Sequence, residues 1–289
     1  MSRVSPDRIA IAVPCFNEAG QAARLGEAVA RLGARVLLAV DDGSTDGTAE
    51  ALEAAGFEVL RHDGNQGLGA ARNTLWREAE KRGCEAVAFL DADVQPPPDY
   101  LTQVCELLGP GVAGVGGRNV DRNPEGFVDA WRGRFWAQDV GPAPLLDAPM
   151  LVGACATYRI RALRDVGGFH PGFRTHGEDV EIGRRLRAGG HRLRYEPSLE
   201  VEHRRVDDPA ALVRSCYLHC REGMRATRSS GEGPPGPGRL VIGLAKKAAW
   251  APAAALVKRR DLREAALGLA ACSAGLAGYA VGWAGPIRG

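Results

Sequence analysis

An apolar stretch that ends in two aspartates constrains this chain more than any other feature. Residues 85–90 read Glu-Ala-Val-Ala-Phe-Leu, Asp91-Ala-Asp93 follows at once, and residues 96–98 are all proline. A short apolar run suits a buried strand, and proline cannot continue a central strand. We therefore expect both carboxylates at the carboxyl end of a strand, the edge at which open α/β sheets bind their ligands.

The pair Asp91 and Asp93 has two interpretations. Neighbouring carboxylates repel each other unless a cation or a proton joins them, and Mg²⁺ and Mn²⁺ take carboxylate oxygens together with substrate phosphates. The alternative is a turn with two solvated carboxylates. Because Asp-x-Asp is a short motif, its neighbours must decide between the two.

Short apolar segments alternate with helical ones in the N-terminal part of the chain. Residues 9–14, 36–40 and 57–60 read as buried strands, in addition to the strand before Asp91. This alternation predicts an α/β fold with a mostly parallel sheet that helices cover on both faces.

Two polar loops follow the second and third of these strands. In the loop 41–48, Ser44 or Thr45 is expected to cap the helix that comes next. The loop 65–73 is rich in glycine and opens another helix, whose N-terminus can attract a phosphate. Arg72 could form a fork to a diphosphate there, or be a surface arginine beside a glycine-rich turn.

Composition excludes some classes of protein. The 289 residues are 45% hydrophobic and 25% charged with a net charge of +2, which is typical of a globular protein and gives no overall basic field for nucleic acid. The seven cysteines are scattered without a Cys-x-x-Cys, which indicates reduced thiols and a cytosolic protein. Cys216, His219 and Cys220 could share a helical face and bind zinc, or simply pack. Since the first residues hold no apolar signal region, we expect no export by that route.

The pattern becomes helical after residue 205. Asp207 or Asp208 with Pro209 is expected to start a helix, and residues 229–238 read as a Gly/Pro linker. Earlier in the chain, residues 127–136 read as an amphipathic helix whose aromatic side chains either line a ligand site or pack in a core.

The C-terminal region is basic and partly apolar. Thirteen Arg or Lys stand against six Asp or Glu between Arg204 and Glu264. Residues 240–257 are apolar around two lysines, and residues 265–287 carry no charge. We expect these helices, anchored by Trp250 and the basic cluster, to lie on an anionic membrane surface at the inner face of the plasma membrane. The alternatives are a membrane span, a helical cap or a homodimer interface.

Several motifs in order resemble one family, the family 2 glycosyltransferases of the GT-A fold. The match runs from about Ile9 to His203, and it rests on order and spacing rather than on any one motif. Its motifs are 13–18 (Val-Pro-Cys-Phe-Asn-Glu), 41–48, Asn65-x-Gly67 with 71–73 (Ala-Arg-Asn), Asp91-Ala-Asp93, 167–169 (Gly-Gly-Phe) and 177–181 (Gly-Glu-Asp-Val-Glu) followed by Arg185-Leu186. The resemblance implies a GT-A domain over residues 1–205, with a C-terminal α-helical region over 206–289.

The resemblance also implies where the donor would lie. Pro14, Glu18 and Asp42 would hold the nucleotide base and ribose, with Ser44 assisting, and Arg72 would contact the diphosphate. UDP is the commonest nucleotide of the donor sugars in the family.

The remaining positions would carry metal and chemistry. By resemblance Asp93 would be the direct ligand of Mn²⁺ or Mg²⁺, Asp91 would lie near ribose and metal, and His203 would be a third ligand. Asp179, with Glu178 beside it, would be the general base of an inverting transfer. We also expect the N-terminus of the helix that these two acids open to keep the carboxylate ionised.

This pattern predicts a metal-dependent inverting glycosyltransferase. It would move a sugar from a nucleoside-diphosphate sugar to a hydroxyl of a saccharide, lipid-linked or small-molecule acceptor. One alternative is a sugar nucleotidyltransferase of the same fold, which would need a basic glycine-rich loop where residues 14–18 stand. The other is a non-catalytic nucleotide- or sugar-binding protein, for which Asp93 and Asp179 would not be needed.

Overall fold

The computed structural model describes residues 4–121, 124, 126–136, 140–204, 207–229 and 262–285. The chain divides into two compact units. The first comprises Met1–Arg122, Gln138–Arg174 and Glu178–Arg204, and the second comprises Asn123–Ala137, Thr175–Gly177 and Arg205–Gly289. The sequence did not predict that residues 123–137 would belong with the C-terminal helices.

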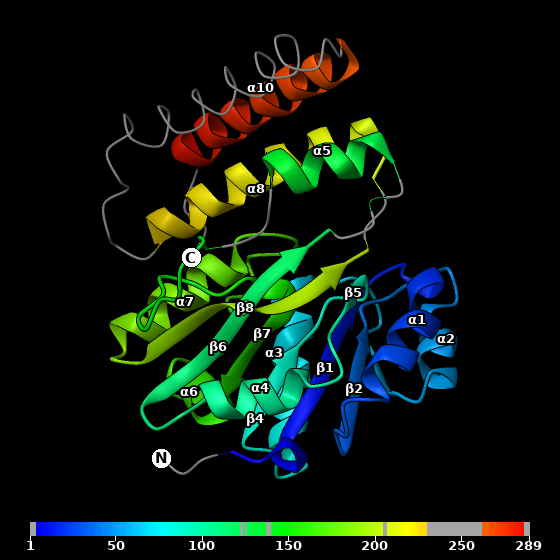
Figure 1. The fold of residues 1–289 in the computed structure, drawn as a ribbon, viewed down its shortest axis with the longest axis vertical. Coiled ribbons are helices and arrows are strands. Elements are labelled where there is room, and N and C mark those ends of the chain that lie inside the picture. Colours follow the sequence, from blue (N-terminus) through cyan, green and yellow to red (C-terminus); the bar gives the residue numbers. More distant parts are fainter. Residues whose placement is uncertain are drawn as a thin grey trace. The chain divides into compact units, whose positions relative to one another are not determined.

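The first unit holds the strands and most of the helices (Figure 1). In chain order its elements are η1 (Pro6–Arg8), β1 (Ile9–Cys15), α1 (Ala19–Val29), β2 (Val36–Asp41), α2 (Thr48–Ala54), β3 (Glu58–Arg61), α3 (Leu68–Lys81), β4 (Ala86–Phe89), β5 (Val94–Gln95), α4 (Tyr100–Leu107), β6 (Val112–Val120), η2 (Gly153–Cys155), β7 (Ala156–Arg159), α6 (Ile160–Asp165), α7 (Glu178–Ala188) and β8 (Arg192–His203).

The strands form one mixed sheet in the order β3-β2-β1-β4-β7-β6-β8-β5. The four strands expected from the sequence are present as β1 to β4, and they pair parallel to one another. In the second half, β7 runs antiparallel to both β4 and β6, and β5 runs antiparallel to β8. The predicted α/β fold is confirmed, although its sheet is less uniformly parallel than the sequence indicated.

Both faces of this sheet are buried, as expected for parallel strands that helices cover. In β1, Ile9, Ile11 and Val13 belong to one apolar cluster, and Ala10 and Ala12 belong to another on the opposite face. Alternate side chains of a strand point to opposite faces, so β1 packs against apolar side chains on both faces of the sheet. This packing fixes the position of its carboxyl end.

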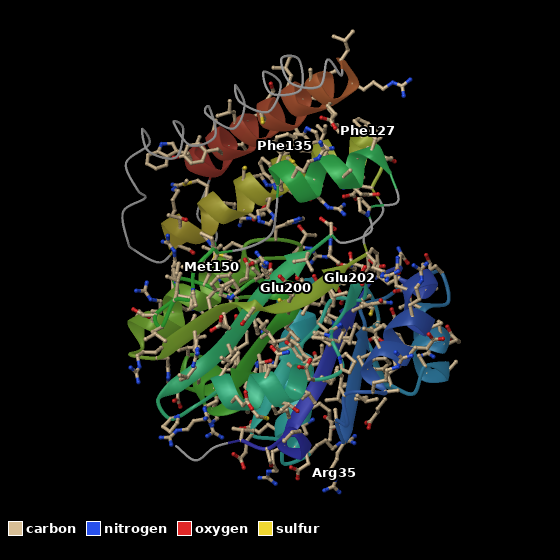
Figure 2. All side chains as sticks on the ribbon, in the orientation of Figure 1. Arg35, Phe127, Phe135, Met150, Glu200 and Glu202 are labelled. Carbon is tan, nitrogen blue, oxygen red and sulfur yellow. The ribbon has the colours of Figure 1, made fainter. Side chains whose placement is uncertain are left out.

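The second unit contains α5 (Phe127–Phe135), α8 (Pro209–Ser229) and α10 (Leu262–Ala284). Phe127 and Phe135 mark the two ends of α5 (Figure 2). Between them Trp131 is fully buried in an apolar cluster with residues of α8 and α10. The expected amphipathic helix is therefore confirmed, and its central aromatic side chain packs in a core.

Helices α8 and α10 lie side by side (Figure 1). A Cβ atom at Gly278 would lie 2.1 Å from the carbonyl oxygen of Tyr217, and one at Gly282 would lie 2.3 Å from that of Arg221. Only glycine allows this approach. The helix expected after Asp208 begins as predicted, because the Asp208 carboxylate accepts the N–H of Ala211 at 2.7 Å.

Other C-terminal expectations have mixed outcomes. All seven cysteines are free, and six of them are buried. Cys216 packs in the apolar cluster of the second unit, and the described residues contain no group of three or more His, Cys, Asp or Glu placed to hold a metal ion. Helix α10 has the length and composition of a membrane span, a weak indication because half of it is buried. Three predicted features lie outside the described residues, namely the linker after Ser229, the apolar residues 240–257 with Trp250, and the basic residues 258–260.

Candidate active site

The predicted polar residues lie where strands β1, β2 and β4 end. Glu18, Asp42 and Asp91 each follow one of these strands within a few residues. Because the three strands are parallel neighbours in the sheet, their carboxyl ends share one edge, as the sequence predicted.

Hydrogen bonds join the loop after β1 to the loop after β2. Asn17, which adopts a left-handed backbone (φ +58°), donates its N–H to the Ser44 hydroxyl at 2.8 Å and accepts the N–H of Thr45 at 3.0 Å. Glu18 donates its N–H to Thr48 Oγ1 at 2.8 Å. These contacts place Glu18 beside the loop that contains Ser44. Pro14 is the penultimate residue of β1 and lies opposite Val40 of β2.

The expected helix cap is wrong. Helix α2 begins after Gly47, which has a left-handed backbone, and no side chain at this N-cap position caps the helix. The Ser44 hydroxyl is used by Asn17 instead, and the N–H of Ser44 goes to Asp41 at 3.0 Å. The pattern of turn residues located the loop correctly, but it could not show that Ser44 bonds to a segment 27 residues away.

Asp42 is buried and organises the next loop. Its two carboxylate oxygens accept the N–H groups of Gln66 at 2.9 Å and Gly67 at 2.7 Å. The Nδ1 atom of His62 lies 2.7 Å from the same carboxylate. The glycine-rich loop before α3 is therefore fixed by Asp42, whose predicted contact with the nucleotide stays a prediction.

Arg72 is buried rather than at the surface, so the alternative of a surface arginine is wrong. Its guanidinium donates to Glu178 Oε1 at 2.5 Å and to the carbonyl oxygen of Gly153 at 3.1 Å, and it lies 3.5 Å from Asp91 Oδ1. Burial alone would lower the pKa of Arg72, but the charge of Glu178, followed by that of Asp91, raises it. The arginine stays charged and links the end of β4 to the start of α7.

Asp93 and His203 are brought together by the pairing of β5 with β8. Val94 of β5 lies opposite His203, the last residue of β8, and the Asp93 carboxylate is 3.4 Å from His203 Nε2. On the other side of the ring, Asp121 Oδ1 lies 3.3 Å from Nδ1. Figure 2 shows Glu200 and Glu202 on the same strand, β8.

The predicted metal set of Asp91, Asp93 and His203 is assembled only in part. Asp91 faces Arg72 instead, and the described residues hold no three-residue cluster suited to a metal ion. The Asp93 and His203 pair nevertheless fits a hard divalent ion, since a carboxylate oxygen and an imidazole nitrogen converge and Asp121 can take the other imidazole nitrogen. Burial and the charge of Asp93 raise the pKa of Asp91 to about 6 despite the opposing charge of Arg72.

Asp179 and Glu178 open α7 as predicted, and they differ in surroundings. Glu178 is buried with Oε1 on Arg72, and its Oε2 finds no hydrogen-bond partner among the described residues. Asp179 is less buried, and its carboxylate accepts the N–H of Val180 at 2.7 Å. Burial and the charge of Glu178 raise the pKa of Asp179 to about 7. Burial and the charge of Glu178 thus oppose the stabilisation of the ionised Asp179 carboxylate that we expect from the helix N-terminus.

Sequence reasoning missed three residues of the site. Asp121 stands alone after β6, and His62 has no motif around it. Asn17 was seen only as part of a motif, without its role in joining two loops. The polar residue directly after β6 could have drawn attention to Asp121, since strand ends collect site residues, whereas nothing in the sequence marks His62.

Comparison with solved structures shows a GT-A fold. The structure resembles the mannosyltransferase PcManGT from Pyrobaculum calidifontis, solved with GDP-Man and Mn²⁺, with a TM-score of 0.65 and 21% identity over 96% of this chain and 89% of that one. It also resembles glucosyl-3-phosphoglycerate synthase from Mycobacterium tuberculosis, solved with Mn²⁺, UDP and glucosyl-3-phosphoglycerate, with a TM-score of 0.55 and 19% identity over 79% and 81% of the two chains.

The chain belongs to glycosyltransferase family 2, because the sequence pattern described as "Glycosyl transferase family 2" matches residues 10–167. It is 34% identical over 212 residues to the pre-mycofactocin glycosyltransferase of M. tuberculosis, which covers 68% of this chain and 42% of that protein. It is 28% identical over 214 residues to the N-acetylglucosaminyl-diphospho-decaprenol L-rhamnosyltransferase of the same species, over 61% and 69% of the two chains. The chain thus spans well under half the length of the first of these relatives.

Proposed function

We propose that this chain transfers a sugar from a nucleoside-diphosphate sugar to an acceptor hydroxyl, with inversion at the anomeric carbon and with the help of Mn²⁺ or Mg²⁺. The observation that carries the proposal is the arrangement around Arg72, which joins Asp91 at the end of β4 to the helix start that bears Asp179. Donor-side and acceptor-side carboxylates thereby belong to one fixed network.

In this proposal Asp179 acts as the general base. The acceptor oxygen forms a bond to the anomeric carbon while the bond from that carbon to the diphosphate breaks, and the hydroxyl proton passes to the Asp179 carboxylate. The nucleoside diphosphate leaves as an anion. No covalent intermediate with the enzyme is needed, so one carboxylate is sufficient.

Asp93 and His203 are the residues that would hold the divalent ion, which when bound would neutralise charge on the departing diphosphate. The solved relatives PcManGT and glucosyl-3-phosphoglycerate synthase contain Mn²⁺ together with a nucleotide or nucleotide sugar. Their nucleotides are GDP-linked in one case and UDP in the other, so both bases belong in a donor screen. Pro14, Glu18, Asp42 and Ser44 are the proposed neighbours of the base and ribose.

The proposal extends to a partner of the C-terminal region. Helix α10 carries exposed apolar side chains, among them Leu269, Val281 and Trp283, and it has no charge after Glu264. Together with the basic excess that the sequence carries between Arg204 and Glu264, these side chains suit an anionic membrane at the cytoplasmic side. A second copy of the chain is the alternative occupant.

A donor screen tests the proposed activity. UDP-, GDP- and dTDP-sugars are incubated with the protein, with and without Mn²⁺, and hydrolysis and thermal stabilisation are followed. We expect one donor class to be hydrolysed slowly, and to stabilise the fold, only when Mn²⁺ is present. Lipid-linked and free saccharides added to that donor then identify the acceptor class, and no response to any nucleotide sugar would contradict the proposal.

A further inference from the structure

Arg72 lies beneath the site rather than on its surface. Only 2% of the residue is exposed, and its guanidinium lies 5.6 Å from the ring centres of both Phe89 and Phe169. A guanidinium that is enclosed by aromatic rings and already bonded to a carboxylate has little surface left for a ligand. The function of Arg72 therefore follows from its contacts with other residues of the protein.

Those contacts join three parts of the site that are far apart in the sequence. Glu178 begins α7, Asp91 follows β4, and Gly153 begins the short helix η2. The bond from Arg72 to Glu178 connects residues 106 positions apart, and the bond to the Gly153 carbonyl connects residues 81 positions apart. Arg72 is thus a junction between the donor-side carboxylate and the helix that carries Asp179.

Gly153 connects the same arginine to Asp179 by a second route. Its carbonyl accepts from Arg72, while its N–H hydrogen-bonds to the Asp179 carboxylate. A Cβ atom at this position would lie 2.9 Å from an Arg72 terminal nitrogen and 3.2 Å from Glu178 Oε1. The backbone of Gly153 therefore contacts the ion pair through its carbonyl and the proposed base through its N–H.

We propose that Arg72 and Glu178 form a positioning pair, which holds the Asp179 and Asp91 carboxylates in their working arrangement and does not itself bind the donor diphosphate. This inference rests on the proposed transferase function. Glu178 Oε2 and Arg72 Nε have no hydrogen-bond partner among the described residues. Each side chain consequently depends on the few bonds named above, and removing one partner leaves the other charge buried without compensation.

The test separates positioning from binding. R72K and E178Q are compared with the double variant R72M/E178M, in which both charges are replaced by apolar side chains that a buried site tolerates. Nucleotide affinity is measured by calorimetry, kcat and KM are measured with the donor identified in the screen, and circular dichroism checks folding. We expect each variant to lose about a hundredfold or more in kcat, the scale of a misplaced reacting group, while donor KM and nucleotide Kd change less than about threefold.

E181Q is the matched control. Glu181 lies one turn further along α7 and is also buried, and it pairs with Arg185, which bonds to the carbonyl oxygens of Val166 and Gly168. This variant removes a similar charge from the same helix, and we expect its kcat to stay within about threefold of wild type.

Three outcomes would overturn the inference while leaving the proposed function intact. Nucleotide affinity that falls in R72K and the double variant while kcat holds would make Arg72 a diphosphate contact. A folded double variant with wild-type kcat would remove any role for the pair, and equal losses in E181Q would reduce the effect to general loosening of α7. If the wild-type protein neither transfers a sugar nor hydrolyses any nucleotide sugar, the proposed function fails and this inference fails with it. The three outcomes above leave the proposed function standing, so the two failures can be told apart.

Discussion

Asp179 has surroundings that set the pH range in which it can act. Since burial and the charge of Glu178 raise its pKa to about 7, the carboxyl is protonated below that pH and cannot accept a proton from an acceptor. We therefore expect kcat/KM to rise as pH increases through about 7 and then to level off. Above pH 7, where the carboxylate is ionised, D179N should lower turnover by about a hundredfold or more, with donor affinity nearly unchanged, and the difference from wild type should shrink at lower pH.

The measurement is a pH profile of kcat/KM for wild type, together with nucleotide titrations of D179N and E181Q. A profile that is flat from pH 5 to 8, or full turnover in D179N, would assign the proton transfer to another group. Loss of nucleotide affinity in D179N would instead place this carboxylate on the donor side.

Asp121 acts, in our account, through His203. Its carboxylate lies 3.3 Å from Nδ1 and leaves Nε2 directed at Asp93, which is how a carboxylate orients a metal-binding imidazole. D121A should weaken Mn²⁺ binding by about 10- to 100-fold, as measured by calorimetry with Mn²⁺ in the presence of the nucleotide. E200Q alters another carboxylate of this sheet, which pairs with Arg118, and should leave Mn²⁺ affinity unchanged. Equal Mn²⁺ affinities in both variants and wild type would remove Asp121 from the site.

At the scale of elements, the packing of α8 on α10 depends on glycine. G278A places a Cβ atom 2.1 Å from the carbonyl oxygen of Tyr217, so the helices must move apart. We expect the free energy of unfolding to fall by about 1–3 kcal/mol, the usual cost of overpacking. Thermal or urea denaturation of the full chain measures it.

G223A is the control for that substitution. Gly223 also lies within a helix, α8, but a Cβ atom there meets nothing within 4 Å. Because alanine favours a helix interior over glycine, this variant should gain about 0.5–1 kcal/mol. If both substitutions change the stability in the same direction, the close approach of the two helices is not what holds them.

Local pattern was sufficient for much of the fold. Strands β1 to β4 were predictable because each is a short apolar run that ends in polar turn residues, and α8 was predictable from Asp208 and Pro209. The mixed half of the sheet was not, because the antiparallel pairing of β7 with β4 and β6 is set by contacts between distant segments.

The site was predictable to a similar extent. The position of Asp91 and Asp93 after a strand could be predicted from the local pattern, whereas Asp179 and His203 were singled out only by the order of motifs that resembles family 2, and the roles of all four stay predictions. The motifs could not show that Arg72 is buried against Glu178, 106 residues away. They also could not show the raised pKa of Asp179, because burial depends on the complete fold.

For the molecule as a whole, membrane contact through α10 is a prediction with a direct measurement. Vesicles containing phosphatidylglycerol should co-sediment the full-length protein at low salt and release it as salt screens the basic residues. L269E adds a charge at a residue that is 61% exposed on α10 and should abolish this binding. L146E, at an apolar residue 72% exposed in the first unit, should not. Failure of the wild type to bind these vesicles at low salt would favour a cap or dimer interface.

The claim that organises this account is a donor site completed by a divalent ion at Asp93. Calorimetric titration of wild type and D93A with UDP and GDP, each with and without Mn²⁺, tests it most directly. We predict that wild type binds one of these nucleotides at least about tenfold more tightly with Mn²⁺, because the diphosphate otherwise faces uncompensated carboxylates. D93A should stay folded, since Asp93 lies at a strand end outside the core, and should lose the gain from Mn²⁺. Tight nucleotide binding that is the same with and without Mn²⁺, in both proteins, would contradict the account.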